Sequence, residues 1–228
     1  VFLDQEVLNQ KRRDMGPYTF AAQMLQNPIA DESQGFKRDW IRFYDRVNHK
    51  MQNIYVLVDA ANSKKRGSDY TAVWVVGLGP DKNFYILEMI RDYLSLTQRS
   101  TLVINLHKKW KPHRKGVRYE KYGLMGDIDH LKTEMENQSY RFEIIEVGGN
   151  LPKEDRIRRL IPLFEQNRFY FPRQQYYTGH DNKTRDMVQV FLEEEYRSFP
   201  VSRHDDMLDS LSRLCEPDLP LVWPKEIG

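Results

Sequence analysis

The sequence has a single cysteine, Cys215, and no long apolar run. One cysteine excludes an internal disulfide framework and a zinc site built from several thiolates, and it fits a reducing cytoplasm. A membrane-spanning helix needs about 20 apolar residues in succession, and the sequence contains no such run. Asp4 and Glu6 interrupt the apolar residues at the N-terminus, which argues against a signal peptide. We therefore expect a protein that is not secreted and does not enter a membrane.

A strong charge of either sign is also lacking. The chain has 35 Lys and Arg against 33 Asp and Glu, a formal net charge of +2, so any affinity for nucleic acid must come from local patches. Neither a G-x-x-x-x-G-K-[ST] loop nor a G-x-G-x-x-G motif is present, and we expect no nucleotide cofactor. The missing initiator methionine leads us to expect a fragment of a longer protein.

The 228 residues, 40% of them hydrophobic, are enough for one large or two small domains. The first fifty residues differ from the rest, with short helical patterns over 3–13 and 18–26 and a cluster of aromatic residues over 36–44. We expect residues 1–50 to be an N-terminal subdomain or the remnant of a preceding domain, and residues 51–228 to form the main domain.

The main domain begins with three predicted strands, of which residues 54–58 are continuously apolar and typical of a central strand. Short connections between the three strands indicate an antiparallel meander. Helices and strands then alternate, with a proline expected to kink one helix at position 162. The expected order is βββαβαβα and then more helix, which is an α/β fold. After the three strands we expect a helix before Pro112, a strand at 116–122, a helix at 127–137 and a strand at 141–147. A helix at 157–164, a short strand at 168–171, and helices near 188–192 and 204–215 should follow.

Candidate functional residues are acids on two of the strands and on the last helix. Asp59 ends the first strand, where a carboxylate is costly to desolvate unless it is paired or binds a cation. Its alternative role is to cap a turn. Glu120 interrupts the strand at 116–122, and the alternative there is a solvated side chain paired with Arg118 or Lys121.

The strongest local pattern is the helix over 204–215. At about 100° per residue, Asp205, Asp206 and Asp209 lie on one arc and the apolar residues lie opposite. Like charges three or four residues apart repel one another unless a cation lies between them. Compensation of the helix dipole explains Asp205 and Asp206 well but Asp209 poorly, because that effect fades after the first turn.

Oxygen ligands from separate elements are what hard divalent cations prefer. We therefore predict a two-metal site for Mg²⁺ or Mn²⁺, in which the ions activate water and stabilise the leaving oxygen of a phosphodiester. The shortage of cysteine and the absence of a paired histidine motif argue against zinc. The candidate metal ligands are Asp59, Glu120, Asp205, Asp206 and Asp209.

The order βββαβαβα with acids at these places resembles the ribonuclease H-like fold. Within that superfamily, the run V-L-V-D-A-A-N-S-K-K-R-G-S-D-Y-T-A over 56–72 and H-D-D-M-L-D-S-L over 204–211 resemble the nuclease domain of the terminase large subunit of tailed bacteriophages. The resemblance covers roughly residues 53–216. Residues 20–28, with Phe36 and Trp40, are also similar to the region that links the terminase ATPase and nuclease domains.

The resemblance implies a metal-dependent endodeoxyribonuclease that cuts concatemeric double-stranded viral DNA during genome packaging in the host cytoplasm. Its implied partners are double-stranded DNA, a terminase ATPase domain on the same full-length chain, the small terminase subunit and the portal protein. Its implied catalytic residues are Asp59, Glu120, Asp206 and Asp209, with Asp205 competing for the helical position. Asp69 also lies in the family pattern, where a turn role is an alternative.

The basic segment at 64–66 follows Asp59, and the basic segment at 107–118 precedes Glu120. Both are candidates for DNA contact through phosphates. The alternative is that they are solvated loops. A tyrosine-rich segment at 174–181 is either a DNA-contacting β-hairpin or a connection. The candidate DNA-binding residues are Lys64, Lys65, Arg66, Lys108, Lys109, Lys111, Arg114 and Lys115.

Two other functions remain open from the sequence. A junction resolvase or transposase of the same fold would share the acids, and a preference for branched DNA would favour it. A DNA-holding or capsid-docking module would have silent acids, and a lack of both cleavage and stabilisation by Mn²⁺ would favour that reading.

Overall fold

The computed structural model describes residues 35–60, 70–120, 125–149 and 151–225. The helices expected over 3–13 and 18–26, the basic residues Lys64, Lys65 and Arg66, and Asp69 lie outside the described residues.

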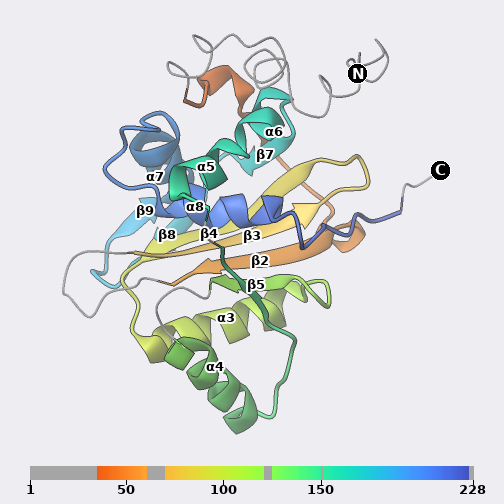
Figure 1. Ribbon diagram of the computed structural model, residues 1–228, viewed down its shortest axis with the longest axis vertical. Coiled ribbons are helices and arrows are strands. Elements are labelled where there is room, and N and C mark those ends of the chain that lie inside the picture. The colour runs from red at the N-terminus through yellow and green to blue at the C-terminus, as the bar shows by residue number, and fades with distance from the viewer. Residues whose placement is uncertain (1–34, 61–69, 121–124, 150, 226–228) are drawn as a thin grey trace.

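The described residues form a seven-stranded mixed sheet with the order β1-β7-β4-β3-β2-β5-β6 (Figure 1). Strands β2, β3 and β4 pair antiparallel, whereas β5, β6, β7 and β1 join the sheet through parallel pairs. The predicted fold, an antiparallel meander followed by parallel strands, is confirmed. The strands are β1 (Arg42–Tyr44), β2 (Asn53–Asp59), β3 (Thr71–Leu78), β4 (Phe84–Asp92), β5 (Val117–Glu120), β6 (Ile145–Val147) and β7 (Phe169–Pro172).

The central strand β2 separates two cores. Its side chains alternate between the faces of the sheet, so Tyr55 and Leu57 enter one core while Val56 and Val58 enter the other. All four are almost completely buried. A strand covered on both faces explains the continuous apolar run that the sequence shows here.

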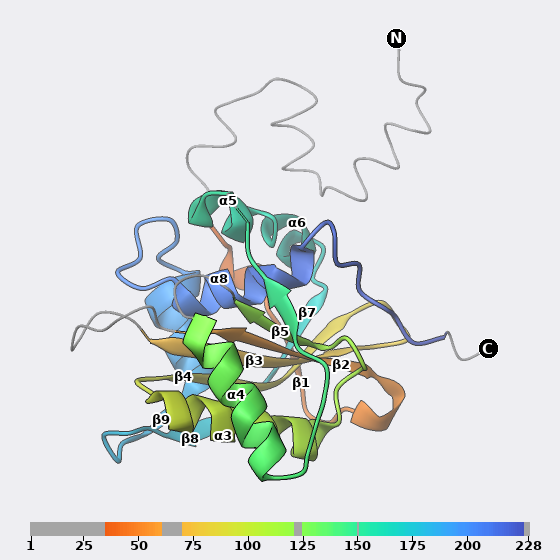
Figure 2. The same cartoon turned by 60° about the horizontal axis from the view of Figure 1, so that its bottom comes forward.

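Helices α3 (Leu96–Trp110) and α4 (Met125–Asn137) cover one face, as Figures 1 and 2 both show. A capping box fixes the start of α3, because the Ser95 hydroxyl accepts from the Gln98 N–H and the Gln98 side chain accepts from the Ser95 N–H. The helix ends at Trp110. The next residue, Lys111, has a left-handed backbone (φ 48°) and directly precedes the predicted terminator Pro112.

The other face carries the remaining helices. The sequence predicts a single helix around Pro162, but the structure has two short helices that are separated before this proline. Pro162 lies in the first turn of the second helix, where a proline is tolerated. The elements are α5 (Lys153–Arg158), α6 (Ile161–Glu165), α7 (Met187–Val190), the π-helical segment η4 (Phe191–Tyr196), α8 (Asp206–Ser212) and the 3₁₀ turn η5 (Arg213–Cys215).

The described part of residues 1–50 packs on this second core. Phe36, Trp40 and Ile41 are buried there, and β1 pairs in parallel with β7. Two 3₁₀ turns, η2 (Arg38–Trp40) and η3 (His49–Met51), flank β1. The domain boundary near residue 50 stays a prediction.

The tyrosine-rich segment forms part of a two-stranded hairpin, β8 (Tyr176–Thr178) and β9 (Thr184–Asp186). The strand expected over 141–147 is shorter, since only Ile145–Val147 pairs with β5. None of the helices in the described ranges has both the length and the apolar character that crossing a membrane requires.

Candidate metal centre

Three carboxylates from three elements meet at one edge of the sheet. Asp59 is the last residue of β2 and Glu120 the last residue of β5, and these neighbouring parallel strands end together because Val58 pairs with Tyr119. Asp209 comes from α8, which packs on β2 and β3. One carboxylate oxygen of each of the three residues lies within 4.8 Å of the others. Among the described residues, this is a group that can hold a metal ion.

Helix α8 is held in place by two buried side chains, Trp74 of β3 and Glu195 of η4. The Trp74 indole N–H donates to the Met207 carbonyl at 2.8 Å. The Glu195 carboxylate accepts from the backbone N–H groups of Met207 (2.9 Å) and Leu208 (3.1 Å), which caps the first turn of the helix. Asp209, only 3% exposed, is thereby placed against the strand ends.

Glu195 is a residue that the sequence reasoning missed. It is fully buried and pairs with Arg91 at 2.9 Å, and burial raises the pKa of its carboxyl to about 7. A signal for it exists in the sequence, since Glu195 follows the apolar Val188 and Phe191 at helical spacing and therefore falls on the inward face.

The acids repel one another and are poorly solvated. The pKa of Asp59 is raised well above its usual value, first by removal of the carboxylate from water and then by Glu120 and Asp209. Burial also raises the pKa of Asp209, although Arg156 opposes that shift. The second oxygen of Glu120 is buried and has no hydrogen-bond partner. A buried, unpartnered carboxylate oxygen among other carboxylates fits a hard divalent cation with oxygen ligands.

Cationic side chains surround the three acids. Arg156 binds Asp209 with a fork, and Arg213 binds both Glu120 and Glu216. Lys153 places its Nζ 2.6 Å from Asp205 Oδ1, 3.4 Å from Asp206 Oδ1 and 3.8 Å from Asp209 Oδ2. Burial lowers the pKa of Lys153, but its aspartate partners outweigh burial and raise it above the usual value. Sequence reasoning singled out none of these three cations, because only the packing of α5 and η5 against the strand ends brings them here.

The aspartates of the 204–215 segment separate in the structure. Asp209 joins the cluster, whereas Asp205 precedes the first helical residue with φ −142° and, like Asp206, lies beside Lys153 at the edge of the site. The expectation of a single arc fails for Asp205 because α8 begins only at Asp206. A metal-binding role for Asp205 and Asp206 stays a prediction.

Within the basic segment over 107–118, the part before β5 (107–115) does not lie beside Glu120, despite its closeness in sequence. The His113 N–H donates to the Ile54 carbonyl at 2.8 Å, which places this loop at the opposite end of β2 from Asp59. Five residue steps of strand separate the two ends by about 17 Å. DNA contact by this segment stays a prediction. Within it, Lys108 binds Gln138, Lys109 binds Glu88 and Arg114 binds Glu143, while Lys111 and Lys115 are exposed.

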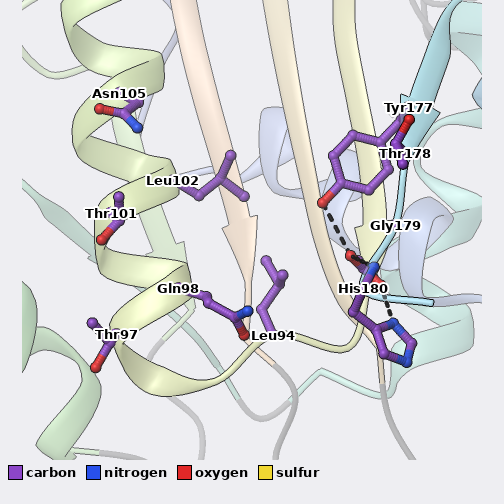
Figure 3. A pocket seen from close by; sticks show the side chains of 11 residues that line it. Leu94, Thr97, Gln98, Thr101, Leu102, Asn105, Tyr177, Thr178, Gly179 and His180 are labelled. Atoms are coloured by element: carbon purple, nitrogen blue, oxygen red, sulfur yellow. Dashed lines mark hydrogen bonds and ion pairs between the residues drawn. The ribbon is translucent and has the colours of Figure 1, made fainter. Parts of the chain in front are cut away.

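A separate cleft of about 450 Å³ lies between α3 and the hairpin (Figure 3). Figure 3 shows Thr97, Thr101 and Asn105 along one face of α3, with Tyr177 and His180 across from them. Buried Asp92, the last residue of β4, ties the hairpin to the sheet, because it accepts from the Tyr177 hydroxyl (3.0 Å), the His180 N–H (2.9 Å) and the His180 ring (2.6 Å from Nδ1). The sequence pointed to the tyrosines but not to the cleft.

Comparison with known proteins gives one family match. The family model described as "Terminase RNaseH-like domain" matches residues 56–216. No curated protein matches the chain.

Several solved structures share the fold. The human cytomegalovirus terminase nuclease domain has a TM-score of 0.53 at 14% identity, covering 77% of this chain and 91% of that one. A manganese-soaked structure of the same domain also gives 0.53, at 12% identity, covering 80% and 96%. The large terminase from the thermophilic bacteriophage D6E gives 0.54 at 12% identity, covering 93% of this chain and 52% of that one. This chain thus spans about half of the D6E protein.

Proposed function

The chain belongs to the Terminase RNaseH-like domain family, and on that basis we propose that it is a divalent-metal-dependent endonuclease that cuts double-stranded viral DNA during genome packaging. The family match confirms the resemblance carried by the two sequence runs, both of which fall within residues 56–216. The single observation that supports the proposed chemistry is the convergence of Asp59, Glu120 and Asp209, with carboxylate oxygens within 4.8 Å of one another.

In this proposal Asp59, Glu120 and Asp209 hold Mg²⁺ or Mn²⁺. Bound cations would supply an activated water and charge stabilisation at the scissile phosphate. The protein contributes a fixed ligand geometry, since α8 is pinned by Trp74 and Glu195. The manganese-soaked cytomegalovirus domain makes Mn²⁺ the first ion to test.

The proposed partners follow from the family as well. The chain spans about half of the D6E large terminase, which supports an ATPase domain elsewhere on the full-length chain. The small terminase subunit and the portal protein are the further proposed partners, and the host cytoplasm is the proposed location.

A plasmid-nicking assay on the 228-residue chain tests the proposal. Wild-type protein should nick supercoiled plasmid when Mn²⁺ is added, and Asp59→Asn should abolish nicking because it removes a charged ligand. Asp129→Asn, an exposed aspartate on α4, is the matched control and should keep full activity. Nicking by Asp59→Asn at the wild-type rate would overturn the assignment, and no nicking by wild-type protein would favour a silent module.

A further inference from the structure

Asp209 of the proposed metal centre forms a bidentate ion pair with Arg156. Arg156, on α5, places Nη2 at 2.6 Å from Asp209 Oδ2 and 2.8 Å from Oδ1, and Nε at 3.0 Å from Oδ1. Both oxygens of this carboxylate are therefore engaged by one guanidinium. The same Nη2 lies 4.0 Å from Glu120 Oε1, so the guanidinium borders two of the three proposed ligands.

The guanidinium has an anchor of its own. Its remaining nitrogen, Nη1, donates to the Leu151 carbonyl at 2.8 Å. The Arg156 side chain is 11% exposed, whereas that of Arg213, the other arginine of the site, is 1% exposed and shared between Glu120 and Glu216. The Arg213 side chain is thus enclosed by its two glutamate partners. The Arg156 side chain borders the carboxylate cluster and remains partly exposed to solvent.

A divalent cation and Arg156 need the same oxygens. The fork of Arg156 engages both carboxylate oxygens of Asp209, so a cation and the guanidinium compete for the charge and the roughly four lone-pair sites of one carboxylate. The positive charge of the guanidinium also repels a cation placed between Asp209 and Glu120. A bound cation therefore favours an Asp209 carboxylate turned away from Arg156, and the Leu151 carbonyl keeps the guanidinium near the cluster when that happens.

A guanidinium that is released from Asp209 can bind a phosphate group instead. The planar fork of arginine matches phosphate as well as carboxylate, in two parallel hydrogen bonds. In the proposed reaction the scissile phosphate would lie against cations held by Asp59, Glu120 and Asp209, and a guanidinium bordering Asp209 and Glu120 would be within reach of it. Lys153 is a point charge already shared by three aspartates and offers no such fork.

We propose that Arg156 exchanges partners: it competes with a divalent cation for Asp209, and once displaced from that carboxylate it binds a phosphate of the DNA substrate. This inference rests on the proposed nuclease function. Arg156 then has two opposed effects, since it weakens metal binding and strengthens DNA binding. An arginine with a purely structural role would strengthen both, because its loss would loosen the whole site.

The test measures the two affinities separately on the 228-residue chain. Mn²⁺ affinity is measured without DNA, from the electron paramagnetic resonance signal of free Mn²⁺, and affinity for a short duplex is measured by fluorescence anisotropy with Ca²⁺ in place of Mn²⁺. We expect Arg156→Gln to bind Mn²⁺ about tenfold more tightly and duplex about tenfold more weakly, the scale of one charge-assisted contact. Arg158→Gln, which removes the half-buried partner of exposed Glu154 on the same helix, should change neither affinity.

Arg156→Lys covers the case in which the glutamine variant fails to fold. Lysine keeps the charge but cannot form the fork, so both affinities should shift in the same directions by a smaller factor. If either variant binds Mn²⁺ more weakly than wild type, or if neither affinity changes, the inference is wrong. If wild-type protein itself binds no Mn²⁺, the proposed nuclease function fails instead, which keeps the two failures distinguishable.

Discussion

The buried carboxylate of Glu195 accepts a hydrogen bond from the backbone N–H of Met207 at 2.9 Å. Glu195 lies in η4 and Met207 in the first turn of α8, so this contact joins two helical segments that follow one another around the second core. Asp209 follows Met207 by two residues on the same helix. The position of its carboxylate therefore depends on the cap that Glu195 supplies from η4.

Replacement of Glu195 by alanine should destabilise the fold by about 3 kcal/mol, because it leaves buried Arg91 with a single partner and the first turn of α8 without its cap. The free energy of unfolding is measured by urea titration with circular dichroism. Glu194→Gln is the matched control. It also removes a partner of Arg91, but from a side chain that is 48% exposed, and should cost less than about 1 kcal/mol. Equal losses in the two variants would contradict the capping role.

The raised pKa of Glu195 predicts a pH-dependent stability with a definite sign. The folded protein keeps the proton up to about pH 7, whereas the unfolded chain releases it near its usual value of 4.5. The contribution of this group is therefore fully present below pH 4.5 and is lost as the pH rises to 7, by at most roughly 3 kcal/mol.

Asp59 and Asp209 also have raised pKa values, so their effect has to be subtracted. The unfolding free energy of wild type minus that of Glu195→Gln should fall between pH 4.5 and pH 7 in buffer containing a chelator. A difference that is flat with pH, or that rises, would show that Arg91 keeps Glu195 ionised throughout.

The sequence predicts the elements whose pattern is long and locally determined. The apolar run at 54–58 predicts β2, and the proline-terminated apolar pattern before Pro112 predicts α3. Strand β1 escapes such reasoning because three residues are too few to show a period, and its pairing with β7 joins residues far apart in the chain.

Some residues of the candidate site can likewise be identified from local sequence, whereas others are recognised only from the packing of the fold. Asp59 is detectable as an acid at a strand end and Glu120 as an acid within a strand. The location of the basic loop is not detectable, because β5 carries the chain across the sheet between His113 and Glu120. Arg156 is one of many charged residues in its segment, and nothing local marks it. Its role emerges only when α5 packs against α8.

Asp92 is expected to hold the hairpin that forms one wall of the cleft. Asp92→Ala removes the acceptor for Tyr177 and His180 and should cost about 2–3 kcal/mol, as loss of hydrogen bonds to a buried charge does. Hydrogen exchange of the backbone amides over 176–186 should accelerate, as mass spectrometry can measure. Asp181→Ala removes an exposed pair with Arg185 at the hairpin tip and should leave stability unchanged within about 0.5 kcal/mol. Unchanged hairpin exchange in Asp92→Ala would contradict the anchoring role.

Asp59→Asn should stabilise the protein while it removes the response to metal. Asp59 is held among Glu120 and Asp209 and out of water, so loss of its charge relieves repulsion and should add about 1 kcal/mol in chelator, a gain typical of residues kept for function rather than stability. Wild-type protein should gain about 5–10 °C in Tm at a Mn²⁺ concentration one hundred times Kd, because binding to the folded state alone adds about 2.7 kcal/mol. The variant should gain almost nothing. Scanning calorimetry with and without Mn²⁺ measures both effects, and a variant that is less stable than wild type in chelator and still responds to Mn²⁺ would mean that Asp59 is not a ligand.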